Sequence, residues 1–323
     1  MDSMGKFVVL FILTCISFDN CIAQKIDNMA SFRDIKSANY FRFYYDNDFF
    51  AATDENYTQG YSFELVSPYF KTNPINYLFY KPKEVEIRYG LAVEHIGYTP
   101  NRYELPEIQF DDRPFAAAIM LKSFLIAVDT LNNGRYTTSF NFGLIGPAAF
   151  GEEMQVGIHK ATGNKTPLGW RHQIKNDIVI NYEIGYEKQL VRYRDLFSLQ
   201  ANTTAKVGTL FTTGSVGINT TFGIINSPFK STKTVNGFKL YAYAQPLFTV
   251  VGYDATLQGG LFNNKSPYTI SSKEVERFTS QFNYGIVLKT RTLYFEYSRS
   301  SITKEFETGS SAKWGGFKVG FTL

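Results

Sequence analysis

Apolar and polar residues alternate along many segments of this chain, and this alternation constrains its fold more than any other feature. Segments 238–245 and 292–298 show it clearly. Because successive side chains of a β-strand point to opposite faces, a period of two predicts strands with one apolar and one polar face. In the longest example, residues 177–187, the apolar face has Ile178, Ile180, Tyr182, Ile184 and Tyr186, and the polar face has Asp177, Asn181, Glu183 and Glu187.

Three features favour a membrane barrel over a soluble β-sandwich, whose strands would alternate in the same way. The predicted strands are long, roughly ten residues or more, as a tilted bilayer crossing requires. Their second face carries charged side chains, which suits a polar lumen. The chain also ends on an alternating segment over 317–323. Aromatic residues make up 17% of the chain and charged residues only 19%, a balance that fits aromatic-rich β structure.

Twelve such segments can be counted, and an even number keeps both termini of a barrel on one side of the membrane. We therefore predict an all-β fold, a transmembrane antiparallel up-and-down β-barrel of 12 strands. It forms one domain over residues 24–323 and is expected to be a monomer. The predicted strands cover residues 40–50, 57–67, 84–96, 114–129, 137–147, 177–191, 196–209, 212–224, 236–250, 276–290, 291–302 and 312–323.

Residues 1–23 are predicted to be a cleaved signal peptide. Lys6 precedes a short apolar run, and Ala23 closes a cleavage site. The run is too short to cross a bilayer. Both cysteines, Cys15 and Cys21, leave with this segment, so the exported chain has no disulfide. Together with the barrel pattern, this predicts the bacterial outer membrane as the location of the protein.

Polar residues concentrate in three connections between the predicted strands, over 46–60, 98–116 and 146–173. In an up-and-down barrel whose chain starts in the periplasm, the connections from odd to even strands all lie at the outer rim. The three segments therefore converge at one mouth of the barrel. A site facing the outer leaflet of the membrane would form there.

These connections carry a series of short motifs, and two more lie near the end of the chain. In chain order they are Asn47-Asp48, Tyr57-Thr58-x-Gly60, Asp112-Arg113-Pro114-Phe115-Ala116, Gly146-Pro147 with Gln155 and His159, Thr256-Leu257-Gln258-Gly259, and Glu305-Phe306-x-Thr308-Gly309. Together they resemble the lipid A 3′-O-deacylase family (the LpxR-like outer-membrane deacylases). The resemblance covers nearly the whole chain after residue 23 and follows the order of the family's motifs.

The resemblance implies a calcium-dependent esterase that removes the 3′-linked acyloxyacyl group from lipid A, the lipid part of lipopolysaccharide. It implies His159 as the general base and Asp48 as a calcium ligand, with Asn47 and Thr58 supporting the catalytic site. The predicted reaction is direct attack by water. His159 takes a proton from the water, and calcium at Asp48 stabilises the developing oxyanion.

The histidines can also be weighed without the resemblance, since a base that works near neutral pH is most easily a histidine. The chain has three. His159 lies in the longest outer connection, where a solvated loop histidine is the alternative interpretation. His172, beside Trp170, is expected to be structural or a substrate contact, and His95 is expected to be a lumen residue of the third strand.

Alternation also predicts where the other candidate side chains point. Asp48 has the parity of Arg42 and Asp46, so it should face inward near the rim. A carboxylate there suits calcium, which prefers oxygen ligands, whereas an ion pair with Arg42 is the alternative. Thr58 is also expected to face inward. Asn47 has the opposite parity and can join the site only if its strand turns or bulges there.

We assign Arg102, Gln155 and Lys160 to substrate binding. Gln155 belongs to the motif, and Lys160 follows His159. Arg102 stands in the segment where the resembling family has a basic residue, typically lysine, and a guanidinium can contact a lipid A phosphate with two nitrogens. Because arginine and lysine bind differently, the position of the cleaved ester stays open.

Several alternatives remain. Another calcium-dependent lipid esterase, such as a phospholipase, would use the same scaffold, and a non-catalytic barrel would need no site at all. A serine nucleophile is disfavoured because the chain has no G-x-S-x-G motif, although another Ser–His arrangement stays open. The formal net charge of +4 is too small and too scattered for a nucleic-acid-binding face.

Overall fold

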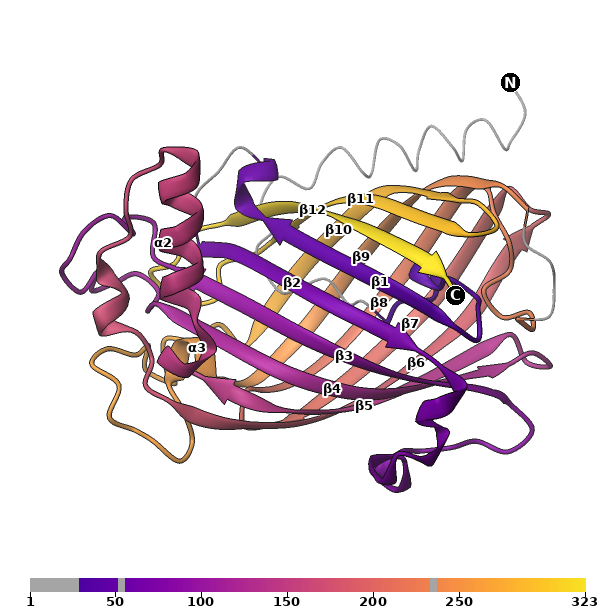
Figure 1. Cartoon of the computed structure of the whole chain (residues 1–323), viewed down its shortest axis with the longest axis horizontal. Helices are drawn as coiled ribbons and strands as arrows, with labels where there is room; N and C mark the ends of the chain where they lie inside the picture. The colour runs from indigo at the N-terminus through magenta and orange to yellow at the C-terminus, as the bar shows by residue number, and fades with distance from the viewer. Residues whose placement is uncertain (1–28, 52–55, 233–236) are drawn as a thin grey trace.

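The computed structural model describes residues 29–51, 56–232 and 237–323, and these form a closed barrel of antiparallel strands. Each strand pairs with its neighbours in chain order, and β12 pairs with β1 to close the ring (Figure 1). The strands are β1 (Tyr40–Asn47), β2 (Asn56–Val66), β3 (Glu86–Thr99), β4 (Ala116–Asp129), β5 (Gly134–Ile145), β6 (Asp177–Tyr193), β7 (Phe197–Gly208), β8 (Phe211–Ile224), β9 (Lys239–Asp254), β10 (Phe278–Lys289), β11 (Leu293–Ile302) and β12 (Ala312–Thr322).

The predicted fold class and strand order are therefore confirmed, with strand bounds that shift by a few residues. The predicted signal peptide, residues 1–23, lies outside the described residues. Within the described ranges, none of the helices is both long enough and apolar enough to cross a membrane.

The two ends of the barrel differ in their connections. One end, called the loop end here, carries most of the long connections, with α2 (Gly151–Thr162) and α3 (Ala255–Gln258) among them (Figure 1). The other, called the turn end, holds the tight turns 130–133, 194–196 and 290–292. In outer-membrane barrels, long loops face outward and short turns face the periplasm. The loop end is therefore the outer end.

Alternation separates the membrane-facing side from the lumen as expected. Inward side chains are buried and many of them are polar or charged, whereas many outward ones are apolar and exposed. Because the outward band would meet lipid, its exposure is what a membrane barrel requires. Exposed outward residues include Phe63, Val93, Leu121, Phe142, Ile178, Ile180, Val216, Ile218, Phe248, Ile286 and Phe295.

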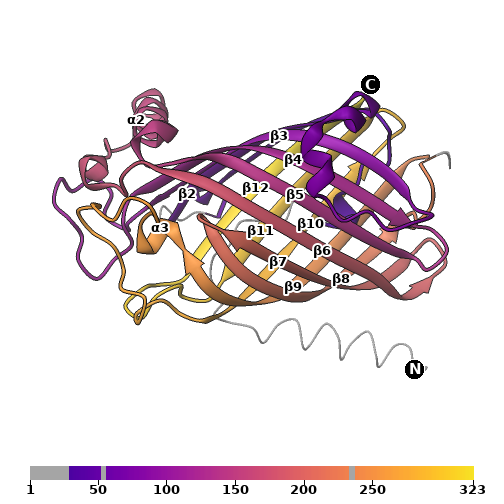
Figure 2. The same ribbon diagram turned by 90° about the horizontal axis from the view of Figure 1, so that it is seen from below.

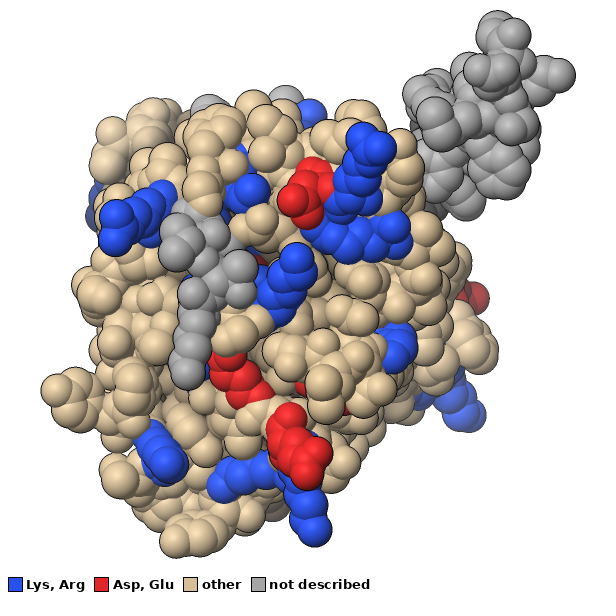
Figure 3. All heavy atoms as spheres, turned by 90° about the vertical axis from the view of Figure 1, so that its right-hand side faces the viewer, with Lys and Arg blue, Asp and Glu red and all other residues tan. Residues whose placement is uncertain are grey.

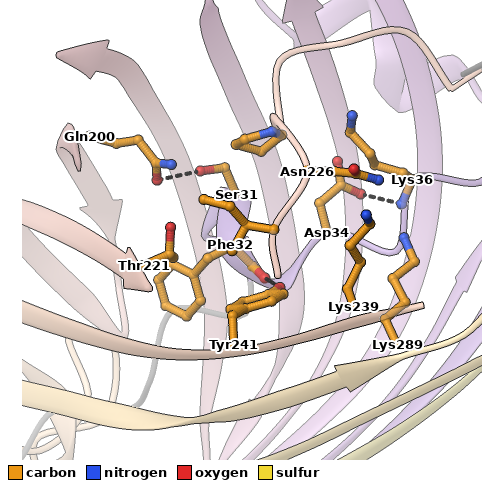
Figure 4. A pocket seen from close by; sticks show the side chains of 12 residues that line it. Ser31, Phe32, Asp34, Lys36, Gln200, Thr221, Asn226, Lys239, Tyr241 and Lys289 are labelled. Carbon is orange, nitrogen blue, oxygen red and sulfur yellow. Dashed lines mark hydrogen bonds between the residues drawn. The ribbon is translucent and has the colours of Figure 1, made fainter. Parts of the chain in front are cut away.

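A short lead-in before β1 passes through the turn end of the lumen. It contains the 3₁₀ helix η1 (Ser31–Arg33). Arg88 donates to both carboxylate oxygens of Asp34, at 2.8 and 2.6 Å, and the Arg33 Nε lies 2.8 Å from Glu296 Oε1. Figure 4 shows a pocket at this lead-in, with Ser31 on one side near Gln200 and Asp34 on the other beside the lysines.

Glu296 on β11 joins several polar groups of the lumen. It accepts hydrogen bonds from the hydroxyls of Tyr243 at 2.8 Å and Tyr294 at 2.6 Å, and Lys318 Nζ lies 3.5 Å away. The side chains of Glu296, Arg33 and Lys318 are fully buried. Buried charges survive only when they are paired and hydrogen-bonded, so this cluster joins the lead-in to three strands of the wall.

Replacing Glu296 with glutamine should destabilise the barrel by about 3–5 kcal/mol, because Arg33 and Lys318 would lose their shared counter-charge in the lumen. Urea-induced unfolding in lipid vesicles measures the loss. Glu107→Gln, on an exposed loop position, is the matched control and should unfold like the unchanged protein. Equal stability of the two variants would contradict a stabilising role of the Glu296 carboxylate.

Candidate functional site

The first candidate segment follows β1 at the loop end. The strand ends at Asn47, and Asp48 opens the 3₁₀ helix η2 (Asp48–Ala51). The ring of Phe50 packs 6.1 Å from that of Phe317 and 6.2 Å from that of Tyr45, both outward-facing residues. η2 is thereby folded over the outer side of the wall. Asp48 is 2% exposed, and since the strand has ended, the predicted inward parity does not apply to it.

A β-bulge brings Asn47 and Thr58 together. The pairing of β2 with β3 shifts between Tyr57 and Gln59, so Thr58 is the extra residue. The Asn47 side-chain amide donates to the Thr58 carbonyl oxygen at 2.7 Å, and the hydroxyls of Thr58 and Thr99 lie 2.6 Å apart. β1 itself pairs regularly through Asn47, so Asn47 keeps the parity opposite to Asp46 and no bulge of its own strand is involved. The bulge in β2 breaks the inward parity predicted for Thr58, because Thr99 has the outward parity of Val93 on β3.

The second candidate segment, α2, packs on the outside of the barrel. Ala116 and Ala118 point into the lumen core, whereas Ala117 packs with Ala149 and Trp170 beside the helix. A Cβ on Gly151 would come within 2.5 Å of the Ala117 Cβ, so the glycine permits close contact. Figure 2 shows α2 outside the wall at the loop end.

His159 lies in the last turn of α2 rather than in a loop. Its side chain is 6% exposed, and its Nδ1 lies 2.6 Å from the Lys165 carbonyl oxygen. A carbonyl can only accept, so Nδ1 carries the proton and Nε2 is left as the basic nitrogen. The Tyr103 ring meets the imidazole edge to face, with centroids 5.1 Å apart. These contacts hold the ring in one orientation.

Gln155 lies one turn before His159 on the same buried face of α2. Its Oε1 accepts a hydrogen bond from Trp170 Nε1 at 2.7 Å, which sets the orientation of the amide. Gln155 Nε2 is buried and has no hydrogen-bond partner among the described residues. A buried N–H group without a hydrogen-bond partner costs free energy, so Gln155 Nε2 is available to donate a hydrogen bond to a ligand.

The structure thus brings the candidate residues to the outer side of the wall at the loop end, around β1–β4. Thr58 contacts Thr99, the last residue of β3, and His159 contacts Tyr103. Tyr103 lies in the β3–β4 connection, which follows Thr99 directly. Sequence reasoning missed Thr99 and Tyr103 as partners. Both lie in the polar segment 98–116, which was the available signal.

His95 shows the same outward placement and corrects the prediction of a lumen residue. It has the parity of Val93, stacks on Tyr61 with centroids 5.0 Å apart, and its Nε2 lies 2.9 Å from the Ala149 carbonyl oxygen. His95 therefore joins β3 to the segment that leads into α2.

The remaining candidates are more exposed. Arg102 precedes Tyr103 and Lys160 follows His159, and both side chains are exposed at the rim. His172 is half-buried, and its Nε2 accepts a hydrogen bond from Arg171 Nε at 3.0 Å.

Three of the sequence motifs form a lid over the loop end of the lumen. Arg113 Nη1 lies 2.9 Å from Glu305 Oε2, and Arg113 Nη2 donates to Thr256 Oγ1 at 3.2 Å. The guanidinium also lies 4.0 Å from the ring centroid of Tyr98. These contacts join the β3–β4, β9–β10 and β11–β12 connections. The motifs therefore secure the loops at this end.

Within the described residues, no group of three or more His, Cys, Asp or Glu side chains could hold a metal ion. A calcium site here would rely on the Asp48 carboxylate together with neutral oxygens, such as the Thr58 and Thr99 hydroxyls and main-chain carbonyls. That donor set suits a hard cation, but a single carboxylate favours weak binding.

An outer-membrane β-barrel with a polar site on its lipid-facing rim is the class that this geometry defines. The model of the family described as outer membrane protein LpxR matches residues 9–323, so the chain belongs to the LpxR family and to the bacterial outer membrane. No curated protein matches the chain.

The fold agrees with that of a solved structure. LpxR from Salmonella typhimurium superimposes with a TM-score of 0.71 at 17% identity, covering 88% of this chain and 100% of that chain. The β domain of a Bordetella autotransporter gives a TM-score of 0.48 at 8% identity, covering 89% of this chain and 100% of that chain. The first match shows the same barrel fold.

Burial raises the pKa of Glu305 to about 7 and outweighs the nearby Arg113 guanidinium; Asp254 also raises it. The folded protein thus holds this proton more tightly than the unfolded chain does. The resulting stability is present below the ordinary carboxyl pKa and is lost as the pH rises through about 7. We expect the lid amides of Glu276 and Glu307 to exchange faster at pH 8 than at pH 5, after correction for intrinsic rates.

Hydrogen exchange followed by mass spectrometry measures this difference. In Glu305→Gln the side chain stays neutral, so the difference between the two pH values should disappear. Lys273→Gln, an exposed change on the same β9–β10 connection, should keep it. Equal protection of the unchanged protein at both pH values would contradict the assignment to Glu305.

Proposed function

We propose that this protein is an outer-membrane lipid A deacylase that hydrolyses the 3′-linked acyloxyacyl ester with His159 as general base. The observation that carries the proposal is the buried His159, with its Nδ1 occupied by a carbonyl and its Nε2 left basic, on the outer side of the barrel wall. Membership of the LpxR family supports the substrate class.

His159 would act on water rather than on a side-chain nucleophile. Nε2 takes one proton from water while the water oxygen bonds to the ester carbonyl carbon. The ester C–O bond then breaks, and the leaving sugar oxygen takes the proton back from His159. A positive imidazole formed on the way lies in the last turn of α2, where the helix dipole favours a cation.

Gln155 and the Asp48 region would stabilise the oxyanion. The Gln155 Nε2 can donate to the ester oxygen, since Trp170 holds the other end of the amide. Asp48, with the hydroxyls of Thr58 and Thr99, would hold calcium, and Asn47 keeps the Thr58 backbone in place. Bound calcium supplies positive charge to a developing oxyanion.

Arg102 and Lys160 would bind the phosphate and sugar groups of lipid A. Their exposed side chains flank Tyr103 and His159, the pair at the centre of the site. The location on the outer side of the wall suits a lipid substrate, because lipid can approach sideways from the outer leaflet. The lumen, filled by the lead-in and its ion pairs, offers no comparable route.

Expression of His159→Ala in a Gram-negative host should leave lipid A intact, whereas the unchanged chain should remove the mass of the 3′-linked acyloxyacyl unit. Loss of a general base costs roughly 10²–10⁴-fold in rate. Mass spectrometry of extracted lipid A measures the reaction. Lys273→Gln, an exposed change on the β9–β10 connection, is the control and should retain activity.

Intact lipid A with the unchanged chain folded in the outer membrane would overturn the deacylase proposal for this substrate. Release of fatty acid from phospholipid in the same cells would then favour a phospholipase. No product from either lipid would favour a non-catalytic barrel.

Asp48→Asn should raise the calcium concentration needed for half-maximal activity by at least about tenfold. Even in water, contact between a divalent cation and a carboxylate is worth more than about 1.4 kcal/mol. Titration of calcium after chelation measures the shift. Asp195→Asn, an exposed change at the turn end, should leave the titration unchanged. Full activity of the unchanged protein in excess chelator would contradict a role for calcium.

A further inference from the structure

Two connections at the turn end are much longer than the tight turns, 67–85 between β2 and β3 and 225–238 between β8 and β9. In the first, the chain forms two 3₁₀ helices, η3 (Pro68–Thr72) and η4 (Pro74–Leu78). Each begins with proline, and the preceding Ser67 and Asn73 side chains accept hydrogen bonds from the first turns. The connection is therefore built with defined caps. Residues 68–83 are called the tyrosine–lysine segment below.

One side of the tyrosine–lysine segment packs against the outer side of the barrel. Phe79 is buried against Leu125 and Ala127, which have the outward parity of Leu121 on β4. The Tyr182 hydroxyl on β6 donates to the Leu78 carbonyl oxygen at 2.9 Å. Figure 2 shows the segment over β3 and β4, at the end opposite α2. It covers membrane-facing wall and not the lumen.

The other side of the segment is aromatic and basic. Tyr69 and Tyr77 are 88% and 90% exposed. Lys71, Lys81 and Lys83 are exposed as well, and the Lys81 ammonium lies 5.8 Å from the ring centroid of Tyr77. Residues 68–83 contain no aspartate or glutamate. Exposing this much aromatic surface to water costs free energy, and the charged side chains of the segment are all positive.

We propose that the tyrosine–lysine segment lies in the headgroup layer of the periplasmic leaflet and binds anionic phospholipid there. The wall beneath it faces the membrane, so its free side continues a surface already in contact with lipid. Tyrosine is enriched where apolar chains meet headgroups, and a lysine stem can lie along the chains while its ammonium reaches a phosphate.

Charge on the rest of this end fits the same partner. Figure 3 shows the turn end, where Lys and Arg side chains cover more of the face than Asp and Glu do. An anionic headgroup layer attracts such a surface, and the attraction weakens with salt. The alternative partner is a periplasmic protein, which would require the segment to lie in water. The two alternatives therefore differ in how deeply the segment lies in the membrane.

The depth of the segment can be measured with a tryptophan at Tyr77. In Tyr77→Trp, reconstituted in phosphatidylethanolamine–phosphatidylglycerol vesicles, we expect blue-shifted emission and several-fold stronger quenching by phospholipids brominated near the headgroup than by ones brominated at the chain end. The native Trp170 and Trp314 are buried, so the parent protein supplies the background. Leu131→Trp, at the exposed tip of the β4–β5 turn, is the control in water.

Emission and quenching of the new tryptophan at the level of the Leu131→Trp control would overturn the proposal. The binding of anionic lipid is tested separately. The protein should bind phosphatidylglycerol several-fold more tightly than phosphatidylcholine in native mass spectrometry. The preference should fall in the variant Lys71→Gln, Lys81→Gln, Lys83→Gln, and persist in Lys265→Gln, Lys273→Gln at the loop end. An unchanged preference in the triple variant would also overturn it.

Discussion

The pairing of β12 with β1 is the constraint on which the rest of the structure depends. In hydrocarbon, an unpaired backbone N–H or C=O is too costly to leave, so a sheet can cross a membrane only as a closed ring. The register runs from Tyr40 opposite Thr322 to Asn47 opposite Gly315. Closure sorts every side chain into a lipid-facing or a lumen-facing set, and each later feature follows from that division.

The lumen-facing set makes the interior a network of buried ion pairs rather than a channel. Arg33 and Asp34 of the lead-in pair with charges from strands on different sides of the ring. Buried ion pairs contribute little net stability, but loss of one partner is expensive. The lumen thus favours one arrangement of the lead-in.

The lipid-facing set departs from simple alternation at the candidate site, as it also does at irregularities between β6 and β7 and between β8 and β9. β1 stops at Asn47, β2 bulges at Thr58, and α2 packs over Ala117. Bulges and strand ends re-aim side chains, as they often do beside functional sites. Polar groups are thereby held on a surface that would otherwise be apolar, within reach of lipid.

The sequence by itself determined the barrel, its strand number and the connections that carry the polar residues. A period of two depends only on neighbouring residues, so it can be read without long-range information. The motifs, through their resemblance to a known family, also pointed to His159, Gln155 and Asn47. The tertiary structure decided which side of the wall they occupy, since the bulge at Thr58 and the packing of α2 depend on contacts between distant strands. It also turned His95 from a predicted lumen residue into an outer-wall contact, because its face is set by register with Tyr61 and by the segment that covers it.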